Sequence, residues 1–240
     1  MLAASAAIAF GAASASIAQT GQMAEDPAFT AKLRASLEAN PELVAEALNA
    51  VQMRQRDAEQ ADLLSRVEPA RAELFAADFG PVIGNPDGTV HVVEFIDYAC
   101  PICKSSHDSV DAIIAKRPEV KVTIAMRNIF GEDSDKLARF ALASSLQGKF
   151  PQTHDALYDA FGDHHETKPT DEALMAVAQK AGLNYDKAVA DMNSPTVNAM
   201  LDKQTELANQ IGVSGTPFFV TSDAVYPGAA PEAVMNEAFR

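Results

Sequence analysis

Two cysteines, Cys100 and Cys103, are the residues of this chain best suited to chemistry. They are the only cysteines among 240 residues, and they stand three positions apart in the stretch EFIDYACPICKSSHD, after an apolar run. If the apolar run is a strand and the residues after it form a helix, Cys100 lies at or just before the first helical turn. Unpaired backbone N–H groups point at a sulfur in that place. We therefore expect the pKa of Cys100 to fall below the roughly 8.5 of a free thiol.

The pattern favours thiol–disulfide exchange. Cys100 would be the attacking sulfur, Pro101 restricts the loop, and Cys103 is close enough to resolve a mixed disulfide. Other readings remain open. A zinc site normally takes four ligands, so it would have to be shared between subunits, because no second CxxC or CxH occurs. A structural disulfide would close a very small loop and stabilise little. Two inert buried thiols fit poorly with a helix start.

Acidic and imidazole side chains flank the pair. Glu94 lies within the apolar run, and a carboxylate facing a core has a raised pKa and can accept a proton from a buried thiol. Alternatively, the Glu94 carboxylate has only a structural role and is paired with a backbone group or a lysine. We expect Asp97, at the end of the strand, and His107, about two helical turns past Cys100, to be solvated. We predict no metal site, since no ligand spacing is visible at the other histidines, which are His91, His154, His164 and His165.

The order of elements around the pair predicts an α/β sheet. Residues 90–97 are apolar on both faces, as in a central buried strand, and residues 120–126 form a second strand. A helix between the two requires a right-handed parallel crossover. Residues 134–211 read as wholly helical, and strands resume at 217–220 and around Val225. Helix caps are expected at Ser134, Thr170 and Ser194-Pro195, helix ends at Gly148, Gly182 and Gly212, and a closing helix from Pro231.

The N-terminal residues predict export. Residues 1–18 are Ala-rich and uncharged and contain small-x-small steps, which is typical of a secretory signal, although no Lys or Arg precedes Lys32. The alternative is an Ala/Ser tail. Export would place the cysteines in an oxidising compartment.

A helical region follows the first residues. Asp26-Pro27 and Asn40-Pro41 are helix-start signals, and no glycine interrupts the chain from there until Gly80. The apolar stripe through Val44, Leu48 and Val51 needs a partner, either the main domain or copies of the chain.

Composition limits the partners. The net charge is -14, from 33 acidic against 19 basic residues. This balance argues against a nucleic-acid or anionic-membrane surface, because such partners need clustered Lys and Arg.

VVEFIDYACPICK followed by GVSGTPFFV, with a helical block between them, resembles the DsbA-like branch of the thioredoxin superfamily. The resemblance covers Val82 to the C-terminus. It implies an α/β, thioredoxin-like fold with a helical insertion at about 133–211.

The same resemblance implies roles for residues near the cysteines. The bond before Pro217 would be cis, and Thr216 and Pro217 would border the sulfurs and contact substrate. Glu94 matches the buried acidic position, and Pro101 and Ile102 form the active-site loop. No bound cofactor is implied, only a redox-active disulfide between Cys100 and Cys103.

The N-terminal part is similar to that of ScsC-type proteins, which carry a helical oligomerisation extension. The resemblance divides the chain into a signal at 1–18, an extension at 19–78 and a catalytic domain at 79–240. It implies a homo-oligomer, such as a trimer, acting as a disulfide isomerase or reductase in the periplasm of a Gram-negative bacterium. Its partners would be cysteine-containing client proteins and a membrane or periplasmic redox protein.

Ile102 bears on the direction of electron flow. It cannot donate a hydrogen bond or a positive charge to the Cys100 thiolate, so the redox potential should lie below that of the strongest oxidants. Two alternatives stay open. One is a monomeric dithiol oxidase, and the other is a Cu(I)-binding or holdase protein that uses the two thiolates.

Overall fold

The computed structural model describes residues 26–162, 167–229, 232, 235–236 and 239. The chain forms two compact units, Met1–Arg56 and Asp57–Arg240. The predicted signal at 1–18, the pair His164-His165 and the start of the closing helix at Pro231 lie outside the described residues.

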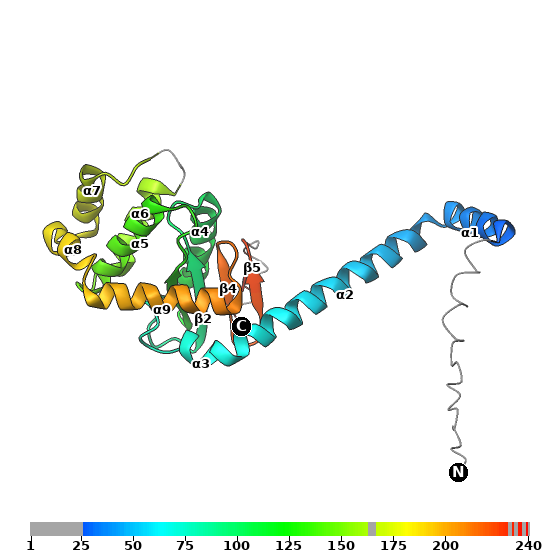
Figure 1. Ribbon diagram of the computed structural model, residues 1–240, viewed down its shortest axis with the longest axis horizontal. Helices are drawn as coiled ribbons and strands as arrows, with labels where there is room; N and C mark the ends of the chain where they lie inside the picture. Colours follow the sequence, from blue (N-terminus) through cyan, green and yellow to red (C-terminus); the bar gives the residue numbers. More distant parts are fainter. Residues whose placement is uncertain (1–25, 163–166, 230–231, 233–234, 237–238, 240) are drawn as a thin grey trace, which may run out of the picture. The chain divides into compact units, whose positions relative to one another are not determined.

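Two helices form the N-terminal region (Figure 1), α1 at Pro27–Ala39 and α2 at Pro41–Val67. Asp26 caps α1 as predicted, accepting a hydrogen bond from the Ala28 amide at 2.9 Å. Helix α2 begins at Pro41 as predicted, but the Asn40 side chain does not cap it. The Asn40 side-chain amide donates to the Ser36 carbonyl at 2.8 Å and so closes the preceding helix.

The long helix stops where the main unit begins its core. Pro69 has no N–H to continue the α-helical ladder, and a short 3-10 helix, η2 (Glu68–Ala70), and α3 (Arg71–Leu74) follow α2. Val67, Ala70 and Leu74 are fully buried. They pack with Val93, Phe95 and Phe218 in a cluster on one face of the sheet.

Five strands form one sheet in the order β1-β3-β2-β4-β5. Their bounds are β1 Val82–Gly84, β2 Val90–Ile96, β3 Val120–Met126, β4 Phe218–Val220 and β5 Val225–Pro227. The parallel pairing of β2 with β3 confirms the predicted crossover, and β2 is the central strand, as expected. Strand β1 lies in a segment rich in turn-forming residues, GPVIGNPDGT, and pairs antiparallel with β3.

The helices of the main unit are α4 (Pro101–Lys116), α5 (Glu132–Ser145), α6 (Phe150–Phe161), α7 (Asp171–Ala181), α8 (Tyr185–Asp191) and α9 (Pro195–Ile211). In Figure 1, α5 to α8 lie together and α9 runs back from them to the sheet. Thr170 and Ser194 cap α7 and α9 as predicted. Gly182 and Gly212 end these helices with φ of 65° and 80°, a region that favours glycine.

Ser134 was wrongly predicted as a cap. Helix α5 starts two residues earlier, after Gly131, and Ser134 is buried in its first turn. The acidic residues Glu132 and Asp133 suit that position, because negative charge is favourable at a helix N-terminus.

One buried amide links three distant segments of the main unit. The Gln204 side chain of α9 donates to the Phe79 carbonyl and accepts from the Met126 amide, both at 2.9 Å. The helical block between β3 and β4 is thereby tied to the sheet. The whole is a thioredoxin-like fold with a helical insertion. Among the described residues, no helix is both long enough and apolar enough to span a bilayer.

Candidate active site

The two cysteines lie at the start of α4, immediately after central strand β2. Cys100 is the N-cap residue, with extended backbone angles of φ -93° and ψ 114°, and Cys103 lies in the first helical turn. Both thiols are free, and Cys100 is 3% exposed while Cys103 is fully buried. The sequence expectation that the first sulfur stands at a strand-to-helix junction is met.

The pKa values of the two thiols are shifted in opposite directions. The pKa of Cys100 is lowered to about 6, first by a hydrogen bond from the Cys103 thiol and further by the Thr216 side chain and the amides of Cys103 and Ile102. Burial and the bond with Cys100 raise the pKa of Cys103. At neutral pH, Cys100 is therefore a thiolate and Cys103 holds its proton.

The loop before β4 meets the cysteines from the other side. The peptide bond between Thr216 and Pro217 is cis. The Cys100 sulfur lies 3.5 Å from the carbonyl oxygen of Thr216, to which it donates only while it carries its proton. The arrangement that the resemblance implied is present, and it arises because β4 pairs antiparallel with β2.

Glu94 lies on β2, opposite Ile124 on one side and Phe219 on the other. It is 2% exposed, and burial, assisted by the charge of Asp111, raises its pKa to about 8. No ion pair to Glu94 exists in the described part of the chain, so the lysine-partner alternative does not hold. A buried carboxyl with this pKa can gain or lose a proton near pH 7.

Asp97 was expected to be solvated, and this is wrong. It is 2% exposed, and its carboxylate accepts from the amides of Ala99 at 2.9 Å and Ile129 at 2.8 Å. Its carbonyl accepts from the Cys100 amide at 3.1 Å. Asp97 thus ties the cysteine turn to the loop after β3, and charged acceptors of this kind make strong hydrogen bonds.

His107 was also expected to be solvated and is instead 5% exposed, because α6 covers it. Its ring stacks on Tyr158 at 4.8 Å and meets the edge of His154, also at 4.8 Å. His154 is buried and shares a 2.8 Å hydrogen bond between its Nδ1 and the Tyr98 hydroxyl. Burial lowers the pKa of His107 to about 4 and that of His154 well below its usual range.

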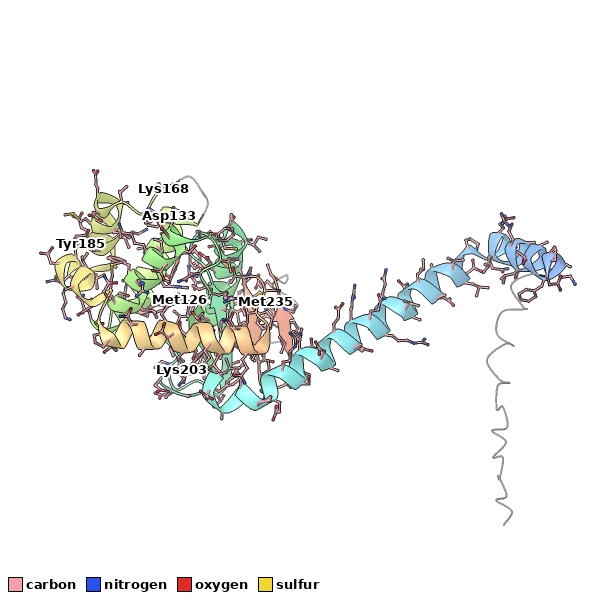
Figure 2. The ribbon with its side chains drawn as sticks, viewed as in Figure 1. Met126, Asp133, Lys168, Tyr185, Lys203 and Met235 are labelled. Atoms are coloured by element: carbon pink, nitrogen blue, oxygen red, sulfur yellow. The ribbon has the colours of Figure 1, made fainter. Side chains whose placement is uncertain are left out.

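Apolar residues that the sequence analysis did not single out lie close by. Ile129 and Phe130 are 40% and 47% exposed, and their own backbone amides donate to the Asp97 carboxylate. Next to them is a hollow of about 390 Å³, at whose rim Lys168 and Asp133 pair at 2.5 Å (Figure 2). It is lined by Ala99, Phe130, Asp133, Leu137, Phe161, Thr167 and Lys168.

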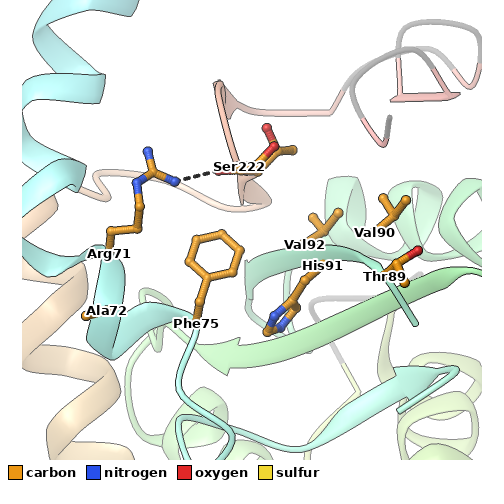
Figure 3. Close-up of a pocket in the computed structure, with 9 residues that line it drawn as sticks. Arg71, Ala72, Phe75, Thr89, Val90, His91, Val92 and Ser222 are labelled. Atoms are coloured by element: carbon orange, nitrogen blue, oxygen red, sulfur yellow. Dashed lines mark hydrogen bonds between the residues drawn. The ribbon is translucent and has the colours of Figure 1, made fainter. Parts of the chain in front are cut away.

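A separate pocket of about 330 Å³ lies at the other end of β2 (Figure 3). Arg71 lies 5.9 Å from the centre of the Phe75 ring and donates to the Thr221 carbonyl at 3.2 Å. His91 lines the pocket and is hydrogen-bonded to Thr123 at 2.7 Å. The pocket contains neither cysteine and is distinct from the redox site.

An ionised thiol at a helix start, a buried protonated thiol one turn later and a cis-proline loop against them define the thiol–disulfide oxidoreductases of thioredoxin-like fold. The DSBA-like thioredoxin domain matches residues 91–240. The chain therefore belongs to the DSBA-like thioredoxin domain family.

Known relatives agree. A thioredoxin-like oxidoreductase from Silicibacter pomeroyi DSS-3 is 36% identical, with a TM-score of 0.63 over 70% of this chain and 94% of its own. The thiol:disulfide interchange protein DsbA of Azotobacter vinelandii is 26% identical over 56% of this chain, a match that spans only 63% of that relative. ScsC of Proteus mirabilis shares the fold, at 23% identity and a TM-score of 0.62, over 90% of this chain and 95% of its own.

Proposed function

We propose that this protein is an exported thiol–disulfide oxidoreductase in which Cys100 is the nucleophile and Cys103 the resolving thiol. The observation that carries the proposal is the Cys100 sulfur at the start of α4, with a pKa of about 6, against the Thr216 carbonyl. Exchange needs no bound cofactor, because the electrons move through the Cys100–Cys103 pair itself.

The order of the exchange steps follows from the lowered pKa of Cys100 and the raised pKa of Cys103. The Cys100 thiolate attacks one sulfur of a client disulfide, a mixed disulfide forms, and the other client sulfur leaves as a thiolate. In isomerisation, a client thiolate attacks the mixed disulfide and releases Cys100. In reduction, Cys103 loses its proton and attacks Cys100, which releases the client thiolate and leaves the Cys100–Cys103 disulfide. A redox partner with a reduced dithiol then restores the two thiols.

Glu94 is the proposed proton acceptor for Cys103. Because Cys103 is buried and its pKa is raised, it attacks only after losing its proton to a nearby base. Glu94 lies on the strand that leads into the cysteine turn, and its pKa of about 8 lets it take and return a proton at neutral pH.

Client segments bind in extended form across the mouth of the site. We assign this role to Thr216 and Pro217 together with the active-site loop, Pro101 and Ile102. Ile102 is 55% exposed and stands beside the nucleophile. The exposed side chains of Ile129 and Phe130 add apolar surface, which suits unfolded clients better than folded ones.

The N-terminal helices are proposed to join copies of the chain. Helix α1 buries none of its residues. Because such a helix gains little stability alone, its apolar face requires a partner. Both helices expose large apolar side chains, namely Phe29, Leu33, Leu43, Val44, Leu48, Val51 and Met53. A homo-oligomer, such as a trimer, would bring several thiol sites to one client, and this favours isomerase or reductase work. In the proposed division into an extension at 19–78 and a catalytic domain at 79–240, assembly would rest on the part of the extension before Asp57, because Val67, Ala70 and Leu74 belong to the core of the catalytic unit.

The periplasm of a Gram-negative bacterium is the proposed compartment. DsbA proteins of Azotobacter vinelandii and Pseudomonas aeruginosa are among the relatives. Residues 1–18 serve as the export signal in this proposal.

The test compares two activities of the full chain. We expect scrambled ribonuclease to regain activity faster than a dithiol peptide is oxidised, and Cys100→Ser to abolish both. Dithiol oxidation without isomerisation would instead identify a dithiol oxidase. Absence of both activities in the wild type, with copper bound to the purified protein, would identify a thiolate metal-binding protein.

A further inference from the structure

We propose that His107, Asp111 and Asp155 bind a zinc ion, at a site separate from the redox cysteines. His107 and Asp111 stand one turn apart on α4, and Asp155 faces them from α6. The ion would join the helix that carries the cysteines to the helical insertion.

The spacing of the three ligand atoms fits a four-coordinate zinc. His107 Nε2 lies 3.4 Å from Asp111 Oδ2 and 3.5 Å from Asp155 Oδ1. Ligands that are about 2.1 Å from a tetrahedral zinc lie about 3.4 Å from one another. All three atoms lie within 4.8 Å of one another, so a small rotation of a carboxylate completes the set.

His107 supplies an observation that the acidic residues alone would not. Its side chain is only 6% exposed, and Nε2 lies 3.4 Å and 3.5 Å from the two carboxylates without a hydrogen bond to any described residue, while Nδ1 is buried without a partner. The ring is held by packing against Tyr158 and His154, which fixes its direction without a hydrogen bond. A neutral imidazole in that position presents a lone pair to a cation.

No lysine or arginine of the described chain forms an ion pair with either carboxylate, although the charges of Lys104 and Lys180 act on them from further away. Lys104 pairs with Asp108 at 2.7 Å and approaches Asp159 at 3.9 Å, and Lys180 pairs with Asp159. Asp111 and Asp155 pair only with His107, and their side chains are 49% and 58% exposed. A dication can therefore enter from solvent, and its charge balances the two carboxylates.

The ligand types select the metal. Imidazole suits zinc and its neighbours among the transition metals, whereas Ca²⁺ and Mg²⁺ prefer oxygen ligands in larger shells. With three protein ligands, the fourth position of the zinc remains for water.

The experiment uses the untagged full chain with Cys100→Ser and Cys103→Ser, so that no thiolate binds metal. Zinc chloride is titrated calorimetrically in competition with a chelator. We expect one zinc per chain, no displacement by excess Mg²⁺, and binding at least about tenfold weaker in Asp155→Asn and His107→Gln. Because the Asp155 side chain is exposed, Asp155→Asn should fold, and its zinc affinity tests the proposal if His107→Gln does not fold.

Two matched variants guard the result. Asp108→Asn removes a carboxylate of the same helix outside the triad and should leave zinc affinity unchanged. His164→Ala/His165→Ala removes the two consecutive histidines of the sequence and should also leave it unchanged. Wild-type affinity in Asp155→Asn, no stoichiometric binding in the parent, or loss of binding in the His164/His165 variant would each overturn the proposal.

Discussion

The sulfur of Cys100 lies 3.5 Å from the carbonyl oxygen of Thr216, a residue 116 positions further along the chain. The contact exists because β4 pairs with β2, the strand that leads directly into the cysteine turn. The nucleophile and the loop proposed to receive a client are thus each attached directly to one of two paired strands.

Alkylation should report the acidity of Cys100. We expect the iodoacetamide rate to be half-maximal near pH 6, the pKa of that thiol, and Cys103 to stay unmodified. Because the folded pKa is lowered, the reduced protein should gain stability relative to a Cys100→Ser variant as pH rises from 6 toward 9. Thr216→Val should move the midpoint upward. A midpoint at the value of an ordinary thiol would remove the basis for Cys100 as nucleophile.

Cys103→Ser should trap the mixed disulfide. Without a resolving thiol, Cys100 can attack a client disulfide but cannot release it intramolecularly. Mass spectrometry of the variant incubated with a disulfide-bonded peptide should show the covalent adduct, and dithiothreitol should reverse it. Cys100→Ser is the control, since its remaining thiol is buried and protonated. An adduct on Cys103 in that control would reverse the assignment.

Glu94→Gln should change how stability depends on pH. A carboxyl whose pKa rises from 4.5 to about 8 on folding holds its proton more firmly in the native state. Native stability therefore falls as pH rises through this window, by up to about 1.4 kcal/mol per pH unit. In urea unfolding, the free energy of unfolding of Glu94→Gln relative to that of the wild type should therefore be larger at pH 8 than at pH 5. The surface substitution Glu73→Gln should produce no such difference.

The same variant should slow the resolving step. Glutamine cannot accept a proton from Cys103, so release of a client from the mixed disulfide should be slower by about tenfold or more at pH 7. Rapid-quench measurement separates this step from the initial attack, which should proceed at the wild-type rate. Equal slowing of both steps would argue for a structural role only.

Ile102→His should make the protein more oxidising. A histidine there can donate a hydrogen bond or a positive charge to the Cys100 thiolate, which stabilises the reduced form. About 1.4 kcal/mol of such stabilisation raises the potential by about 30 mV. Equilibration with glutathione measures the shift, and Ile102→Leu serves as the size-matched control. A wild-type potential near the roughly -120 mV of DsbA would contradict the isomerase or reductase proposal.

Leu33→Glu should reduce the oligomer mass. Leu33 is 48% exposed within a single chain, so a charge there should leave the thermal midpoint of the catalytic unit unchanged. Burial of that charge between copies would be costly. Light scattering should show a smaller particle for Leu33→Glu than for Ala35→Glu, which is also exposed on α1. Identical masses for wild type and Leu33→Glu would count against assembly through this helix.

Local signals made much of the fold predictable. The apolar run of β2 identifies a central strand, and Thr170 and Ser194 identify helix starts, because each signal lies within a few residues of its effect. The position of Cys100 at a helix start follows from the same short-range pattern. The cis bond at Pro217 came from the family resemblance, since nothing local distinguishes it.

The burial of Asp97 and His107 was not predicted, because it depends on partners that are distant in the sequence. Asp97 is buried because the amide of Ile129, more than thirty positions away, turns toward it. His107 is buried because α6 lies over it. The one-turn spacing of His107 and Asp111 is visible in HDSVD, but Asp155 comes from a separate helix, and only the packing of the insertion brings it there.

The distance in sequence between Cys100 and Thr216 also matters while the protein is being made. Chains emerge N-terminus first, so both thiols leave the ribosome long before the segment that shelters them. Until the last tenth of the polypeptide follows, the cysteine pair of a nascent chain lacks the loop that covers it. A reducing environment during synthesis would protect the pair from premature cross-linking.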